Sequence, residues 1–133
     1  MSQENVDVVR QALAAFSPGT RDRAFALADP EIVIDATRNV FNPGAYTGLD
    51  GVLEMLASMD ETWEEMRVEP HEFIDAGERV VVIGMLVGKG KGSGVEVERF
   101  NGQVWTVRDG LVVRLEVGFS DRAAVLEAAG LSE

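Results

Sequence analysis

Hydrophobic residues near the start of the chain recur with the period of an α-helix. After Ser2, a residue suited to capping a helix, the apolar positions that share one face are Val6, Val9, Leu13 and Phe16. Pro18-Gly19 ends this pattern. Thr20 can then cap a short second helix, which must end near Asp29-Pro30 because the residue before a proline disfavours the helical conformation.

A long amphipathic helix is predicted in the middle of the chain. Before it, the β-branched run 31–36 indicates a strand with Asp35 on the same face as Val33. A polar loop over 37–48 follows, with Asn42-Pro43-Gly44 as its turn signal. The apolar residues that then fall on one helical face are Val52, Leu56, Met59, Trp63 and Met66.

From Arg67 onward the hydrophobic period changes to two, which is the period of a strand with one buried face. Strands are predicted over residues 68–74, 79–87, 95–108 and 111–117, with hairpin turns at 75–78, 88–94 and 109–110. Ser120 can cap a last helix over 121–129, and Gly130 is placed to end it. Helices segregated from a largely antiparallel sheet define an α+β fold.

Length and charge limit the functions open to this chain. Its 133 residues are enough for one domain with a real core, spanning 1–133. With 12 Lys and Arg against 23 Asp and Glu, the formal net charge is −11. This charge repels the phosphates of nucleic acids and anionic membrane surfaces, so neither is an expected partner.

Several sequence features that this chain lacks exclude further kinds of chemistry and location. The sequence has no cysteine, which excludes disulfides, thiolate nucleophiles and Cys-ligated zinc. The start lacks the pattern of a secretory signal, and the apolar run 80–88 is shorter than the roughly 20 residues of a membrane helix, so a cytoplasmic protein is expected. His71 is the only histidine and lies on a probable edge strand, and no Asp/Glu cluster at fixed spacing joins it, so no metal site is expected.

A set of segments, taken in order, carries a resemblance to a known family. They are 29–35 (DPEIVID), 46–52 (YTGLDGV), 73–82 (FIDAGERVVV), 104–110 (VWTVRDG) and 111–115 (LVVRL). This set resembles the SnoaL-like group of the nuclear-transport-factor-two-like superfamily, relatives of ketosteroid isomerase. The resemblance implies a cone-shaped, cystatin-like roll, in which a curved, mainly antiparallel sheet wraps around the long helix. It also implies an apolar ligand in the mouth of the cone and a homodimer formed through the outer sheet face.

By that resemblance, Asp35 falls where isomerase-like members keep a general-base carboxylate. An apolar pocket would raise the pKa of such a carboxylate and make it a better proton acceptor. The alternative is a solvated aspartate that starts a turn into residues 37–39. The tyrosine and protonated aspartic acid that hold the enolate in ketosteroid isomerase correspond here to Ala12 and Gln103, so standard steroid isomerisation is not expected. Gln103 can still donate a hydrogen bond to a ligand oxygen.

The resemblance also places the residues that face the ligand and the partner. Pocket-facing positions are expected to alternate along the last two strands, as Asn101, Gln103, Trp105 and Val107, then Val113, Leu115, Val117 and Phe119. Arg99 shares the first of these faces and could pair with Asp35. Further candidates for the pocket wall are Phe16, Tyr46, Met59 and Trp63. The opposite face, expected to form the dimer, carries Val104, Thr106, Val112, Arg114 and Glu116.

These features favour a small-molecule protein over a nucleic-acid or membrane protein. The leading hypothesis is a cofactor-free isomerase, cyclase or hydratase that acts on an apolar, oxygenated ligand, with Asp35 as base and Gln103 as donor. No cofactor is expected, because proton transfer and enolate stabilisation need only protein groups. The alternatives are a non-catalytic small-ligand binding module with the same pocket, and a dimeric scaffold whose pocket is incidental.

Overall fold

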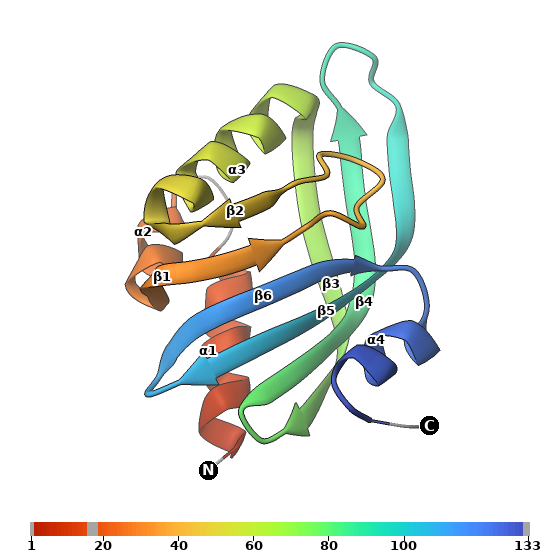
Figure 1. The fold of residues 1–133 in the computed structure, drawn as a ribbon. Helices are drawn as coiled ribbons and strands as arrows, with labels where there is room; N and C mark the ends of the chain where they lie inside the picture. Colours follow the sequence, from red (N-terminus) through yellow and green to blue (C-terminus); the bar gives the residue numbers. More distant parts are fainter. Residues whose placement is uncertain (1, 16–18, 132–133) are drawn as a thin grey trace.

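The structure of the chain, a computed structural model, describes residues 2–15 and 19–131 (Figure 1). Its elements, in order, are α1 (Ser2–Ala14), α2 (Arg21–Ala26), β1 (Ala28–Asp35), β2 (Ala45–Thr47), α3 (Gly48–Thr62), β3 (Trp63–Ala76), β4 (Arg79–Gly90), β5 (Glu96–Arg108), β6 (Leu111–Phe119) and α4 (Arg122–Ala128). None of the helices in these residues is long and apolar enough to cross a membrane.

The strands of the described residues form one six-stranded sheet in the order β2-β1-β6-β5-β4-β3. All neighbouring pairs are antiparallel except β1 and β6, which run parallel. The sheet curves, with α1 and α3 on its concave side and α4 on the convex side (Figure 1). This arrangement confirms the predicted α+β fold with a mainly antiparallel sheet.

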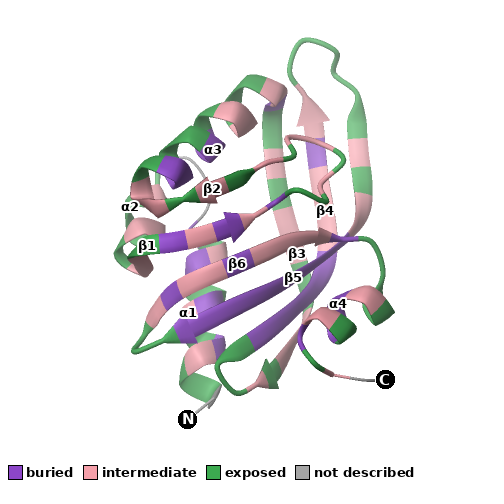
Figure 2. Cartoon of the chain, viewed as in Figure 1, coloured by how far each residue is buried: buried purple, intermediate pink, exposed green. Residues whose placement is uncertain are grey.

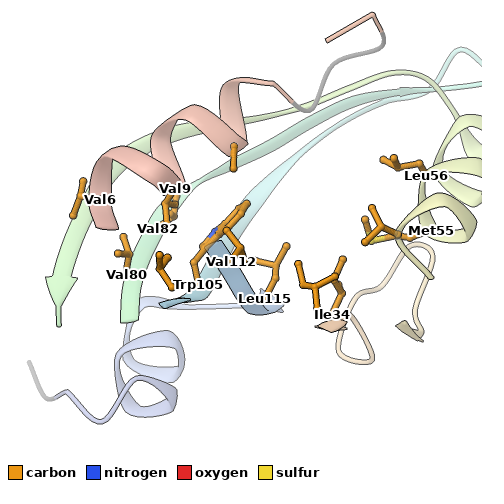
Figure 3. Close-up of a cluster of buried hydrophobic side chains, with 14 residues drawn as sticks. Val6, Val9, Ile34, Met55, Leu56, Val80, Val82, Trp105, Val112 and Leu115 are labelled. Carbon is orange, nitrogen blue, oxygen red and sulfur yellow. The ribbon is translucent and has the colours of Figure 1, made fainter. Parts of the chain in front are cut away.

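Two hydrophobic clusters hold the layers together. Figure 2 shows which parts of the chain are buried, and Figure 3 draws the larger cluster. The larger one joins α1 and α3 to the concave face, and it includes Val9, Ile34, Met55, Trp105 and Leu115. The smaller one joins α4 to the convex face through residues such as Val81, Val104 and Val125. A Cβ built at Gly102 would lie 2.9 Å from the Val125 Cβ, so α4 packs directly on the backbone of β5. The central strands are therefore covered on both faces.

The predicted long helix is wrong at its C-terminal end. α3 stops at Thr62, and the chain enters β3 at Trp63. The pairing of β3 with β4 shifts between Trp63 and Glu65, which marks a β-bulge. The extra residue puts Trp63 and Met66, three positions apart, on the same side of a strand. Their spacing therefore imitates a helical stripe.

Two further register shifts lie between β5 and β6 and move residues between the faces of the sheet. Near Val113 the shift turns Val112 into the interior core, so the expected outward position of Val112 and inward position of Val113 are both wrong. Near Gly118, whose φ is +86°, the shift turns Phe119 to the convex face beneath α4. Leu115 and Val117 lie on the concave side as predicted.

Smaller differences concern strand and helix ends. β1 begins at Ala28, before the predicted start, and β2 lies inside the segment expected to be a loop. The side chain that caps α4 belongs to Asp121, which accepts a 2.8 Å hydrogen bond from the Ala124 N–H, and not to Ser120. Ser2 is the first residue of α1, within the helix. Gly130 adopts a φ of +78° after α4, in agreement with its expected role as a stop.

Candidate functional site

A cavity of about 100 Å³ opens on the concave side of the sheet, between α3, the loop after β1 and strands β3 to β6. An apolar cavity of about 150 Å³ is known to hold a benzene molecule. This cavity is smaller than that but open to the surface, so its interior has room for part of a small ring or for the inner end of a longer molecule. Its wall is mainly apolar, contributed by residues such as Ile34, Met55, Met59, Leu86 and Val117.

Trp63 and Phe41 form an aromatic corner of this cavity. Their rings meet edge to face, with centroids 5.1 Å apart and planes inclined by 73°. Trp63 is only 8% exposed, and a Cβ built at Gly88 would lie 2.8 Å from its ring. The glycine on β4 thus leaves the space that the indole fills. Trp63 and Met59 line the cavity as predicted.

The loop that carries Phe41 is fixed at both its base and its tip. Ala36 and Gly44 exchange backbone hydrogen bonds of 2.8 and 3.3 Å, which closes the loop between β1 and β2. Asn42 donates hydrogen bonds to the side-chain oxygens of Ser58 and Thr62 at 3.0 and 2.8 Å, which ties the loop to the end of α3. Sequence reasoning treated this segment as a polar turn and missed its wall residues, although the apolar pair Val40-Phe41 stands out within it.

The inner wall of the cavity is a row of side chains on β5. Arg99, Asn101, Gln103 and Trp105 all line it, in agreement with the predicted alternation. The Trp105 Nε1–H donates a 2.8 Å hydrogen bond to Gln103 Oε1, and both residues are buried. Because an indole N–H can only donate, the Gln103 oxygen must be the acceptor, which leaves its NH₂ group available to a ligand.

Asn101, on the same wall, has a buried side-chain oxygen without a hydrogen-bond partner among the described residues. This oxygen is Oδ1, and the residue is 8% exposed. A buried carbonyl oxygen without a partner costs about 1–3 kcal/mol, so native proteins seldom keep one without a reason. A hydroxyl or N–H group of a ligand would satisfy it.

Trp105 also separates this cavity from a second one. The second cavity, of about 40 Å³, lies toward α1 and α2 and shares Ile34, Trp105 and Leu115 with the first. These three side chains therefore form the floor of the main cavity (Figure 3).

Asp35 does not face the cavity, so its expected position is wrong. Ile34 and Ala36 line the cavity, whereas Asp35 shares the convex face with Val33. Its Oδ1 accepts hydrogen bonds from the Thr37 hydroxyl at 2.6 Å and the Thr37 backbone N–H at 3.1 Å. This is the geometry of the alternative interpretation, an aspartate that starts a turn.

The environment of Asp35 also moves its pKa in the direction opposite to the expected one. The hydrogen bonds from Thr37 lower the pKa below the ordinary value of 3.8, and the guanidinium groups of Arg38 and Arg114 lower it further, against a smaller opposing effect of burial. Its Oδ2 lies 3.3 Å from Arg38 Nη2 and 3.9 Å from Arg114 Nη2. A carboxylate stabilised in this way is a weak base.

Of the remaining residues expected at the site, some line the cavity and others do not. Arg99 lines the cavity but does not pair with Asp35, whose cationic neighbours are Arg38 and Arg114. Tyr46 packs over Gly44 and Gly51 at the start of α3 and is not part of the cavity wall. Phe119 lies on the convex face under the guanidinium of Arg38, 4.2 Å from its ring centroid. The expectation for Phe16 falls outside the described residues.

The ionisable groups that line the cavity are both arginines. Arg38 donates to the Val117 carbonyl oxygen and to Asp35, at 3.2 and 3.3 Å. Arg99 is half-buried and makes no hydrogen bond or ion pair with the described residues. Within residues 2–15 and 19–131, no Asp, Glu, His, Cys or Tyr lines the cavity, and no group of three His, Cys, Asp or Glu is placed to hold a metal ion.

Comparison with known proteins identifies relatives of this fold. Residues 9–115 match a family model described as a SnoaL-like domain. An NTF2-like protein from Burkholderia xenovorans LB400 is 27% identical, with 97% of this chain and 98% of that chain covered and a TM-score of 0.78. TerC, co-crystallised with polyporic acid, is 25% identical, with coverages of 96% and 98% and a TM-score of 0.76.

A putative SnoaL-like polyketide cyclase from Jannaschia sp. CCS1 shares the fold, with 22% identity, coverages of 99% and 95% and a TM-score of 0.75. Among curated proteins no match was found. The family model spans most of the chain, and the solved structures agree with it over nearly the full length. The protein therefore belongs to the SnoaL-like family and has the NTF2-like fold of the ketosteroid isomerase relatives, as its sequence segments indicated.

Proposed function

We propose that this protein binds a small, mainly apolar molecule that carries a hydroxyl group, in the cavity on the concave side of the sheet. The observation that carries this proposal is the buried Asn101 Oδ1 without a partner, next to the available NH₂ group of Gln103. A ligand oxygen can bind to both amides while its apolar body contacts Trp63 and Trp105. TerC, a relative of 25% identity, was co-crystallised with polyporic acid, which supports a small organic ligand in this fold.

Binding without proton transfer is the better account of the cavity. General-base catalysis needs an acceptor with a pKa near the working pH, within hydrogen-bond reach of the ligand. The described lining offers amides and arginines, and a guanidinium stays protonated in proteins. Asp35 has a lowered pKa and lies on the other face of β1. The non-catalytic binding module thus has more support than the isomerase, cyclase or hydratase.

Replacing each amide of the β5 wall with leucine tests the proposal, because the two variants should behave in opposite ways. Asn101→Leu removes an unpaired buried oxygen, so the melting temperature should hold or rise. Gln103→Leu leaves the Trp105 N–H unpaired and should destabilise the fold by about 1–3 kcal/mol. Calorimetric melting of both variants and the wild type measures this difference. A loss of stability in Asn101→Leu equal to that in Gln103→Leu would contradict a binding role for Asn101.

The same Asn101→Leu variant should change ligand selectivity. Phenol and toluene have nearly the same shape, but only phenol can donate a hydrogen bond to the Asn101 oxygen. We expect the ratio of phenol to toluene affinity to fall about tenfold in the variant, the equivalent of one net hydrogen bond. Titration followed by tryptophan fluorescence measures both affinities.

Substitution of Asp35 separates a turn residue from a general base. Asp35→Ala removes the hydrogen bonds from Thr37 and should lower the free energy of unfolding by about 1–2 kcal/mol at neutral pH, with phenol affinity unchanged. The folded carboxylate has the lower pKa, so its contribution is complete above pH 3.8 and is lost as the pH falls through the lower folded value. Chemical denaturation at several pH values measures this. A stability gain in Asp35→Asn would favour a strained, pocket-facing carboxylate instead.

A further proposal concerns assembly. α4 covers Val104, and Val112 lies inside, so the convex surface left for a homodimer contains Thr106, Arg114 and Glu116 of the expected set. A hollow there is lined by Val33, Thr106 and Val113 together with Glu78, Arg79, Arg108 and Arg114. Arginines beside acids on one patch can pair across a twofold axis, which supports self-association of this strongly acidic chain.

Sedimentation at micromolar protein concentration tests the dimer. The wild type should sediment as a dimer, and Arg79→Glu, which reverses an exposed charge in the hollow, should shift it toward a folded monomer. A monomeric wild type at this concentration would remove the proposal.

A further inference from the structure

We infer that the ligand of the concave cavity is an organic anion, bound through Arg99 at the mouth, with a hydroxyl group directed inward to Asn101. This inference rests on the proposed binding function and adds the charge of the ligand and its orientation. The residues that carry it lie on one strand face, where charge, hydrogen-bonding capacity and hydrophobicity change in order from the cavity mouth to its floor.

The order of side chains along β5 favours a negative charge at the cavity mouth. Inward-facing positions read Arg99, Asn101, Gln103, Trp105 and Val107. Exposure decreases along this row, from the half-buried Arg99 to Val107, which is 1% exposed. A cation thus lies at the open end, two amides follow and an indole closes the row. A molecule that lies along the strand meets a positive charge, then hydrogen-bonding groups, then an apolar floor.

The bonding state of Arg99 also favours an anionic ligand. Its guanidinium makes no hydrogen bond or ion pair with the described residues, although the chain as a whole carries 23 acidic side chains. Arg38, the other arginine of the lining, binds Asp35 and the Val117 carbonyl oxygen. A half-buried guanidinium is stabilised when a carboxylate or similar oxyanion supplies two acceptors in its plane. Arg99 is therefore a cation with room for such an acceptor.

Asn101 gives an independent indication of where the ligand lies. Its unpartnered, nine-tenths buried oxygen is two residues further along the same strand face than Arg99. Two residues of strand span about 7 Å. The ligand class that satisfies both groups is an organic acid whose hydroxyl group and carboxylate lie at opposite ends of a flat or slender apolar body. The carboxylate stays at the mouth, where it keeps part of its hydration.

A pair of probes that differ in charge and by one methyl group tests this inference. 4-Hydroxybenzoate carries its carboxylate and hydroxyl at opposite ends of one ring, and methyl 4-hydroxybenzoate keeps the ring and the hydroxyl but replaces the carboxylate with an uncharged methyl ester. At neutral pH the wild type should bind the acid at least tenfold more tightly than the ester, because a charge-assisted hydrogen bond is worth more than a neutral one. Isothermal titration calorimetry measures both affinities.

Substitutions of Arg99 and of a control arginine test whether Arg99 causes the preference for the acid over the ester. Arg99→Gln should abolish the preference for the acid over the ester, and Arg99→Lys, which keeps the charge but not the planar fork, should retain part of it. Arg23→Gln is the matched control, since it removes the same charge from an exposed position on α2 outside the cavity, and it should keep the wild-type preference.

The possible results distinguish failure of the anionic-ligand inference from failure of the proposed small-molecule binding. Equal binding of acid and ester by the wild type, with phenol still bound, would overturn the anion and leave the binding function standing. A preference for the acid that survives in Arg99→Gln would also overturn it, because the charge would then be recognised elsewhere. Absence of binding by phenol, acid and ester alike would overturn both.

Discussion

The buried hydrogen bond from the Trp105 indole to Gln103 Oε1 organises the interior of this protein. A buried indole N–H needs an acceptor, and here the acceptor lies two residues away on the same strand face. The bond holds the indole across the interior, where it forms a floor with Ile34 and Leu115. On the side of α1 and α2 this floor borders the small cavity of about 40 Å³, and on the other side it borders the main cavity of about 100 Å³. The bond also fixes which end of the Gln103 amide can meet a ligand.

The main cavity depends on irregularities in the strands that surround β5. The bulge near the start of β3 brings Trp63 and Met66 to the same wall, and the shift near Gly118 turns Phe119 away from the cavity to the convex face. Bulges increase the twist and bend of a sheet, so the same features that choose the lining also shape the concave surface. Gly88 completes this wall, because a side chain there would occupy the position of the Trp63 ring.

Sequence patterns predicted the regular parts of this structure well and the irregular parts poorly. Alternation along residues 99–107 was sufficient to place the polar wall, because β5 is regular and central over that stretch. Bulges are set by pairing with a neighbouring strand, which a local pattern does not contain, so Trp63 was assigned to a helix and Phe119 to the cavity. The face of Asp35 could have been read locally. Glu31 and Asp35 flank Val33 on one face of β1, whereas Ile32 and Ile34 form an apolar pair on the other.

The central claim is that ligands enter the space between the two tryptophans and the β5 amides. The chain has two tryptophans, both line the cavity, and one has a hydrogen-bonded indole N–H, so nitrogen-15 NMR observes the site through two indole signals. On titration with phenol, we expect both indole signals and the Asn101 side-chain amide to shift in one saturable process, with Thr106 and Arg114 on the convex face unaffected. Shifts confined to the convex face, with both indole signals unchanged at saturation, would contradict the account.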